Sequence, residues 1–417
     1  MGSTRWLRRG VVLVDQALSS VSNLLAVVLV ARALSAPEFG YFALGYAILT
    51  LTLGLSRAYF GSRISLAPDA QEARRVTSAL VAGMLVLSPL VVLVVLAVAT
   101  AATGGQAPLI AVAVALATPV VCIQDALRFG AIAGGRPWVA LASDALWISV
   151  MAVPFVLSSE LSAPAALTLW GSAAGAALLV ALVGFRERPG LRAGLSELRR
   201  REAVGSALTL GAVATTAATL LVLLAVSRTL GPAAAGSLRG ASTAMGPVNV
   251  LFAFIAVGLT PVLVRRDRRG DRRFCAMVGA VTVGLVLLWG LVLLLLPEGF
   301  GTTAFGESWA GIRSVLAWTV GEYVWIAVAA GAVLGLKVQQ RASGLIATRI
   351  GTATLTVLAG SLAALAVGRV QAVAAAFALS AAVGAVTAWW LLLRPAPRTS
   401  PLLVGRADER AERAPCG

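Results

Sequence analysis

Twelve apolar stretches alternate with short polar breaks along the chain. Because the hydrocarbon core of a bilayer is about 30 Å thick, a helix needs about 20 predominantly apolar residues to cross it. Each stretch therefore predicts one transmembrane helix, and the breaks carry turn residues such as Gly134 and Pro137. The pattern predicts an all-α polytopic membrane protein. The predicted spans are residues 11–34, 40–60, 77–101, 108–133, 138–158, 165–185, 204–228, 237–263, 274–297, 310–336, 343–367 and 369–393.

The first stretch shares two features with a cleavable signal peptide, since arginines precede it and Ala31-Arg32-Ala33 resembles a small-residue cleavage site. It is longer than the 7–15 residues typical of a signal-peptide core, and it carries the polar residues Asp15 and Asn23. We interpret it as a retained first helix. Asp15 and Asn23, with two serines between them, fall on one helical face, which either lines a translocation path or holds helices together.

The basic residues are concentrated in alternate breaks. Lys and Arg number 34 against 18 Asp and Glu, but the chain is 59% hydrophobic and only 12% charged. Its surface is therefore expected to face lipid, and we expect membrane lipids and no nucleic acid as partners. Of the 34 basic residues, 29 lie in the amino terminus, in the even-to-odd breaks or the span ends that adjoin them, and in the tail. The opposite side holds Arg32, Arg228, Arg239, Arg313 and Arg369.

This asymmetry predicts that both termini are cytoplasmic, because Lys and Arg flanking membrane spans stay on the cytoplasmic side. Residues 395–417, rich in Pro, Arg and Glu, are predicted to form a disordered cytoplasmic tail. The localisation that follows is a multi-pass protein of a bacterial cytoplasmic membrane.

A short repeat relates the two halves of the chain. Arg32, Leu34 and Gly40 follow the first span, and Arg228, Leu230 and Gly236 follow the seventh, each shifted by 196 residues. Six spans separate the repeats, so the halves share one orientation and would be related by an axis along the membrane normal. We predict two pseudo-symmetric six-helix bundles, residues 1–196 and 197–394.

Ionisable side chains within apolar spans are costly and usually face a cavity or one another, so each is a candidate functional residue. For substrate binding the candidates are Arg57, Arg128, Arg239 and Arg349, and for coupling or cavity lining they are Asp15, Asn23, Asp125, Asp144 and Glu322. Structural alternatives remain for several of them. Asp125 and Arg128, three residues apart, can neutralise each other on one helix face. Arg57 and Arg239, near helix ends, can extend to the membrane interface.

Glu322 lies near the predicted midplane, about 18 Å into its helix. A carboxylate at that depth needs a partner or a proton, and either state can couple to transport. Trp318 and Trp325 share its helical face, where aromatic rings either pack or stack on a substrate.

Several classes of chemistry are excluded by what the sequence lacks. Histidine is absent, and Cys122, Cys275 and Cys416 have no metal-ligand spacing, so we expect no metal site and no cofactor. No phosphate-binding loop with Gly-Lys-Ser/Thr occurs, so ATP hydrolysis by this chain would not drive its function.

The junction of the first two spans, LVARALSAPEFGYFA at residues 29–43, resembles the corresponding signature of bacterial polysaccharide transporters and O-antigen flippases. These form a family of the multidrug/oligosaccharidyl-lipid/polysaccharide exporter superfamily. Residues 228–236, RTLGPAAAG, and 246–250, GPVNV, are similar to the matching part of the second half. The resemblance implies two six-helix bundles around a central cavity and the export of a lipid-linked glycan. The chain lacks the two extra helices of some lipid-carrier flippases, which weakens a peptidoglycan-precursor assignment.

The function that follows is the flipping or export of a lipid-linked oligosaccharide or polysaccharide precursor by alternating access, with other polysaccharide-assembly proteins as candidate partners. A first alternative is an ion-coupled antiporter of drugs or small molecules, which would depend on Glu322 or Asp15. A second is a membrane glycan polymerase with acidic residues on an external loop. The longest such loop, near residues 298–309 with Glu298 and Glu307, is short, and we expect no enzyme activity.

Overall fold

The computed structural model describes residues 24–394 apart from residues 25–26, 66, 68, 106, 158–161, 186–189, 191, 193, 195, 197–202, 256–271 and 340. Every regular element in the described part of the chain is a helix, which confirms the predicted all-α class. Eight of these described helical segments are long and apolar enough to cross a membrane, and the shorter apolar helices Pro137–Val153 and Val213–Thr229 accompany them. The total of twelve spans and the location of the two termini stay predictions.

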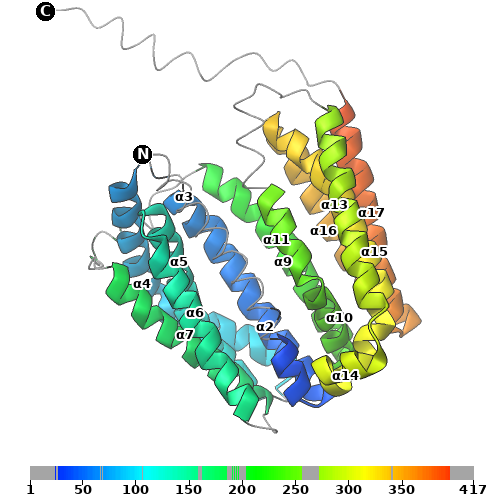
Figure 1. Ribbon diagram of the computed structural model, residues 1–417, viewed down its shortest axis with the longest axis horizontal. Helices are drawn as coiled ribbons and strands as arrows, with labels where there is room; N and C mark the ends of the chain where they lie inside the picture. Colours follow the sequence, from blue (N-terminus) through cyan, green and yellow to red (C-terminus); the bar gives the residue numbers. More distant parts are fainter. Residues whose placement is uncertain are drawn as a thin grey trace, which may run out of the picture.

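The described helices form two groups (Figure 1). We call them the N-lobe and the C-lobe. The N-lobe contains α2 (Ala36–Ser56), η1 (Arg57–Gly61), α3 (Ser62–Ser65), α4 (Ala70–Thr103), α5 (Pro108–Ala133), α6 (Pro137–Leu157) and α7 (Ala163–Phe185). The C-lobe contains α9 (Ala203–Thr229), α10 (Pro232–Ala244), α11 (Gly246–Phe254), α13 (Arg272–Leu294), α14 (Glu298–Phe305), η3 (Gly306–Ser308), α15 (Trp309–Val338), α16 (Ala342–Leu362), η4 (Ala363–Val367) and α17 (Val370–Leu393).

In the N-lobe, α5 packs against α4, α6 and α7, and in the C-lobe α15 packs against α13 and α17. Helix α2 connects the lobes, because it packs against both α9 and α10. The predicted bundle boundary at residues 196 and 197 adjoins a gap in the described residues, and it stays a prediction.

Local sequence explains where α2 begins. The backbone nitrogen and the hydroxyl of Ser35 lie 3.4 and 3.0 Å from Oε2 of Glu38, and Pro37 occupies the first turn. This arrangement satisfies groups that a helix start leaves unpaired. The segment that carries the family resemblance therefore contains a helix-start signal, which sets the residue at which α2 begins.

The lobes meet where α2 and α10 begin. A Cβ atom added to Gly40 of α2 would overlap the carbonyl group of Pro232 in α10. A Cβ added to Gly236 would lie 3.0 Å from Cα of Gly40. The two glycines that repeat at an interval of 196 residues therefore face each other across the contact between the lobes.

We call this contact the closed end of the molecule. From it the lobes diverge toward the end at which α4 begins and α17 finishes, which we call the open end (Figure 1). The arginine asymmetry predicts that the open end faces the cytoplasm.

Two segments differ from the predicted spans. The eighth predicted span, residues 237–263, begins earlier, at Pro232, and is interrupted where α10 gives way to α11 at Gly246 and Pro247. Proline lacks an amide donor, so it disfavours a continuous helix at this point. The predicted external loop at residues 298–309 is helical instead, and Glu298 forms an ion pair there with Arg313.

Candidate functional site

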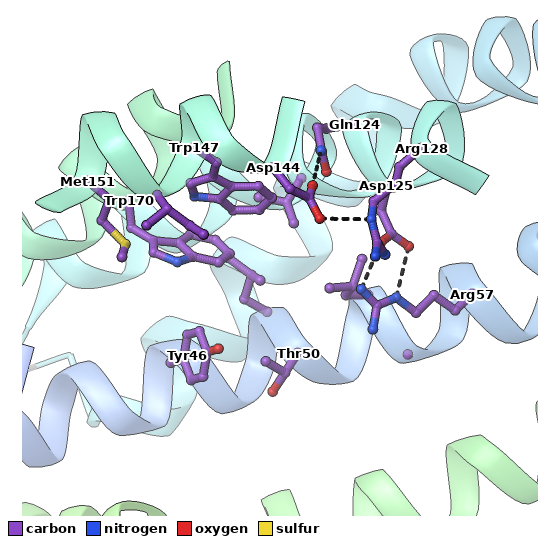
Figure 2. A pocket seen from close by; sticks show the side chains of 15 residues that line it. Tyr46, Thr50, Arg57, Gln124, Asp125, Arg128, Asp144, Trp147, Met151 and Trp170 are labelled. Atoms are coloured by element: carbon purple, nitrogen blue, oxygen red, sulfur yellow. Dashed lines mark hydrogen bonds and ion pairs between the residues drawn. The ribbon is translucent and has the colours of Figure 1, made fainter. Parts of the chain in front are cut away.

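Helix α2 presents one polar face toward the space between the lobes. Tyr46, Thr50 and Arg57 are spaced by four and seven residues, which places them on the same side of a helix. All three line a cavity of about 140 Å³ that α2 forms with α5, α6 and α7 of the N-lobe (Figure 2). We call this cavity the N-lobe pocket.

Arg57 is held at one end of the N-lobe pocket by Asp125 of α5. Its Nε and Nη2 atoms donate to the two carboxylate oxygens at 2.9 and 2.7 Å, a bidentate ion pair. Helix α2 changes to a π-helical turn at Arg57–Gly61, a feature common at functional sites. The Arg57 side chain remains 42% exposed, so its other donors are accessible from the pocket.

Asp125 begins a network of alternating charges that runs into the N-lobe. Nη1 of Arg128 lies 3.9 Å from Asp125, and Nε of Arg128 lies 2.9 Å from Oδ2 of Asp144 on α6. Gln124 donates to Asp144 at 3.3 Å and to Ser143 at 3.0 Å.

Two arginines and two aspartates give this network a net charge of zero. Asp125, Arg128 and Asp144 are 3–6% exposed, and buried charges of this kind require partners. The predicted i,i+3 pairing of Asp125 with Arg128 is therefore present but long, and each residue has a closer partner on another helix.

A second pair of cavities, about 250 and 350 Å³, lies between the lobes. Both are lined by Thr50 of α2, Thr219 of α9 and Arg239 of α10, and we call them together the central cleft. Tyr46 and Thr50 also line the N-lobe pocket, so the pocket and the cleft share a wall.

Arg239 is the cation of the central cleft. Its Nη2 atom donates to the hydroxyl of Thr50 at 3.3 Å, and its guanidinium carbon lies 5.3 Å from the centre of the Tyr46 ring. Among the residues that the structure describes, no carboxylate forms an ion pair with Arg239, and its buried Nε has no hydrogen-bond partner. Its charge is therefore supported by hydroxyl and aromatic groups without being neutralised.

Glu322 of α15 lines the same cleft, half-buried. Beside it, the Tyr323 hydroxyl donates to the carbonyl oxygen of Ser242 at 3.2 Å. Trp318 and Trp325, which the sequence places on the Glu322 face, are 48% and 38% exposed and line none of these three cavities. They do not form a stacking platform in the cleft.

The remaining candidates fall elsewhere. Arg349 is half-buried on α16 and lines none of the three cavities. Asp15 and Asn23 lie outside the described residues. Within the described ranges, no three acidic or cysteine side chains gather in an arrangement that could hold a metal ion.

The structure adds residues that the sequence did not single out. Aromatic rings of Tyr46, Trp147 and Trp170 form one end of the N-lobe pocket, and hydroxyls from α2, α9 and α10 line the cleft. One sequence signal was present, the helical spacing of Tyr46, Thr50 and Arg57. The cleft hydroxyls carried no such signal, because Ser and Thr are also common at helix contacts in membranes.

Comparisons with known proteins agree with this architecture. No protein-family model and no curated protein matches the chain in sequence. An inward-facing multidrug resistance MATE family transporter of the MOP superfamily aligns with 89% of this chain and 93% of its own length, at a TM-score of 0.67 and 13% identity. The lipid II flippase MurJ in an inward closed conformation aligns with 93% of this chain and 87% of its own length, at a TM-score of 0.69 and 11% identity.

The chain has the fold of these membrane transporters. A MATE structure in a bent conformation aligns less well, at a TM-score of 0.51 and 13% identity over 94% of this chain and 97% of its own. The fold expected from the superfamily resemblance is thereby confirmed. The narrower resemblance to polysaccharide transporters and O-antigen flippases stays a prediction.

Proposed function

We propose that this protein moves an anionic lipid-linked oligosaccharide or polysaccharide precursor across a bacterial cytoplasmic membrane by alternating access. It would do so as a transporter without enzyme activity of its own. The fold supports transport, since both a multidrug transporter and a lipid II flippase share it. Two lobes that touch at one end and enclose a polar cleft suit a mechanism in which rocking exposes the cleft to each side in turn.

The observation that carries the choice of substrate is Arg239. A cation without an ion-pair partner in a membrane-embedded cleft is costly unless an anion joins it. The hydroxyls of Thr50, Thr219 and Ser242 around it donate to carbonyl oxygens of their own helices, which leaves their lone pairs to accept hydrogen bonds from sugar hydroxyls. An anionic head group followed by sugars satisfies both kinds of contact.

Arg57 offers a second basic contact in the N-lobe. It lies seven residues beyond Thr50, about 10 Å along α2, and Asp125 fixes its orientation. Arg57 and Arg239 therefore present donors from opposite lobes to one substrate. Arg128, also predicted to bind substrate, is buried between Asp125 and Asp144, and in this proposal it supports the network beside Arg57.

An ion-coupled antiporter of small molecules is the second candidate, and Glu322 favours it. Its carboxylate lines the same cleft as Arg239 and forms no ion pair within the described part of the chain. Such a group can exchange a proton or cation against a positively charged substrate. This alternative predicts that transport depends on Glu322 and not on Arg239.

The test compares lipid-linked sugar on the two faces of the membrane in a bacterial strain that lacks this protein. We expect accumulation on the cytoplasmic face, relieved by the native chain. Arg239→Gln should slow the relief about tenfold or more, because a hydrogen bond to a charged group contributes about 1.5–3 kcal/mol.

Arg228→Gln is the matched control. Arg228 belongs to the same predicted external set, but it donates to the carbonyl oxygen of Ala101 and lines none of the three cavities. It should restore transport fully. No accumulation in the deletion strain would overturn the glycan proposal, and dependence on Glu322 alone would favour the antiporter.

A further inference from the structure

The N-lobe pocket has two chemically different ends (Figure 2). One end carries the aromatic rings of Tyr46, Trp147 and Trp170 together with Met151, and the other carries the charged network around Asp125. A ligand that fits both ends has an apolar face and several polar groups at its edge.

At the aromatic end the rings are fixed against one another. Trp147 and Trp170 have ring centres 5.1 Å apart at an interplanar angle of 60°, and Tyr46 meets Trp170 edge-on at 5.7 Å. Trp170 is 4% exposed and Tyr46 is 5% exposed, whereas Trp147 is half-buried and offers more of its surface. Trp147 is therefore the ring most available to a ligand.

The polar end is rich in hydrogen-bonding groups but neutral in sum. Arg57, Arg128, Asp125 and Asp144 balance one another in ion pairs. A charged ligand would meet no net opposite charge at this end, and displacing a partner from one of the buried pairs is expensive. A neutral ligand with several hydroxyls can donate to the carboxylate oxygens and accept from the guanidinium N–H groups while the ion pairs remain intact.

Size limits the ligand further. At about 140 Å³ the pocket is smaller than the roughly 300–1,000 Å³ of pockets that take drug-sized molecules. It has room for one small unit. Because Tyr46 and Thr50 line both the pocket and the central cleft, a unit in the pocket can remain joined to a head group beside Arg239.

We propose that the N-lobe pocket binds one neutral sugar ring of the substrate, with its C–H face on Trp147 and its hydroxyls toward Asp144, Gln124 and Arg57. This rests on the proposed function for the identity of the whole substrate, but the binding of the sugar itself can be measured separately. The pocket then selects glycan-bearing lipids, while Arg239 supplies attraction for the anionic group.

The experiment uses the full chain in lipid nanodiscs and a panel of methyl glycosides, with binding followed by saturation-transfer NMR on the sugar protons. Native protein should transfer saturation to at least one glycoside. Trp147→Leu should weaken that binding about three- to tenfold, the range expected for loss of an aromatic contact, and Trp147→Phe should retain most of it.

Trp318→Leu is the control, because Trp318 is exposed on α15 and lies outside the pocket. Absence of transfer to every glycoside, equal weakening in both leucine variants, or displacement of the glycoside by a lipophilic cation such as tetraphenylphosphonium would overturn the proposal. Glycoside binding without any effect of the deletion on lipid-linked sugar would contradict the proposed function and leave the sugar site standing.

Discussion

Arg74, Arg136 and Arg341 donate to carbonyl oxygens at the carboxyl ends of neighbouring helices. Arg74 reaches Gly134 beyond α5 at 3.0 Å, Arg136 reaches the last residues of α7 at 3.0 and 3.2 Å, and Arg341 reaches the end of α17 at 2.6 and 2.9 Å. A cation there satisfies unpaired carbonyls and the negative end of the helix dipole. These arginines are held by carbonyl oxygens at helix ends, whereas Arg239 contacts a hydroxyl and an aromatic ring in the cleft.

The buried ion pairs should dominate the response of the N-lobe to single substitutions. Asp144→Asn leaves Arg128, 3% exposed, without its close carboxylate, and removing one partner of a buried pair costs about 3–5 kcal/mol. We expect a marked fall in the midpoint of thermal unfolding. The double variant Arg128→Met with Asp144→Leu should recover most of the loss, because no charge is then left unpaired.

Glu72→Gln provides the control for that measurement. It removes a carboxylate from an ion pair with Arg75 whose side chains are 30% and 73% exposed, and such pairs contribute about 0–1 kcal/mol. Equal destabilisation by Asp144→Asn and Glu72→Gln would show that the buried network does not depend on charge pairing.

Sequence reasoning identified these charged residues from their depth in apolar spans but not their partners. Arg57 and Asp125 are 68 residues apart, and their contact depends on how α2 lies against α5. The spacing of three residues predicted Arg128 as the ion-pair partner of Asp125, because such a rule compares residues on one helix only. From the sequence alone, Arg57 could either extend its side chain to the membrane interface or bind substrate. Neither interpretation paired it with Asp125.

At the scale of helices, glycines let the backbones of α2 and α10 meet, and the Phe39 ring of α2 packs beside them against Gly236 and Gly240. Gly40 and Gly236 allow backbone contact at the closed end, where Phe39 is 1% exposed. Small residues permit this close approach in membranes. The repeat was visible in the sequence, but the mutual contact of the two glycines was not, because it depends on the axis that relates the halves.

Gly40→Ala should open the closed end. The added Cβ would overlap backbone atoms of Pro232, which cannot move without separating α2 from α10. Separation there favours the state with the cleft exposed at that end. In a chain whose native cysteines are replaced, the thiol of Thr219→Cys should then react several-fold faster with a membrane-impermeant maleimide added from outside.

Gly54→Ala is the matched control on the same helix. A Cβ at Gly54 meets no atom within 4 Å, so the substitution changes helix propensity without touching α10. Reaction rates that rise equally in both variants, or in neither, would mean that the glycine contact does not hold the closed end shut.

For the whole molecule, the spans were predictable and the arrangement of the lobes was not. The most apolar described helix segment is also poorly buried: the most apolar 18 residues of α4 have a mean hydropathy of 2.8 and 28% of them are buried, against 2.0 and 67% for the corresponding residues of α5. In lipid, an apolar side chain gains little by turning inward. Hydrophobic periodicity therefore locates membrane helices but does not say which faces pack together.

Orientation in the membrane decides which side the open end faces. The arginine asymmetry predicts the cytoplasm, and two exposed positions at opposite ends test it: Arg369, before α17, and Gln71, at the start of α4. In a cysteine-free chain, Arg369→Cys should react with an impermeant maleimide in intact cells, and Gln71→Cys only after permeabilisation. The reverse pattern would turn the closed end toward the cytoplasm. The described conformation would then receive substrate from outside, and a flippase working from cytoplasm to exterior would have to load in a different state.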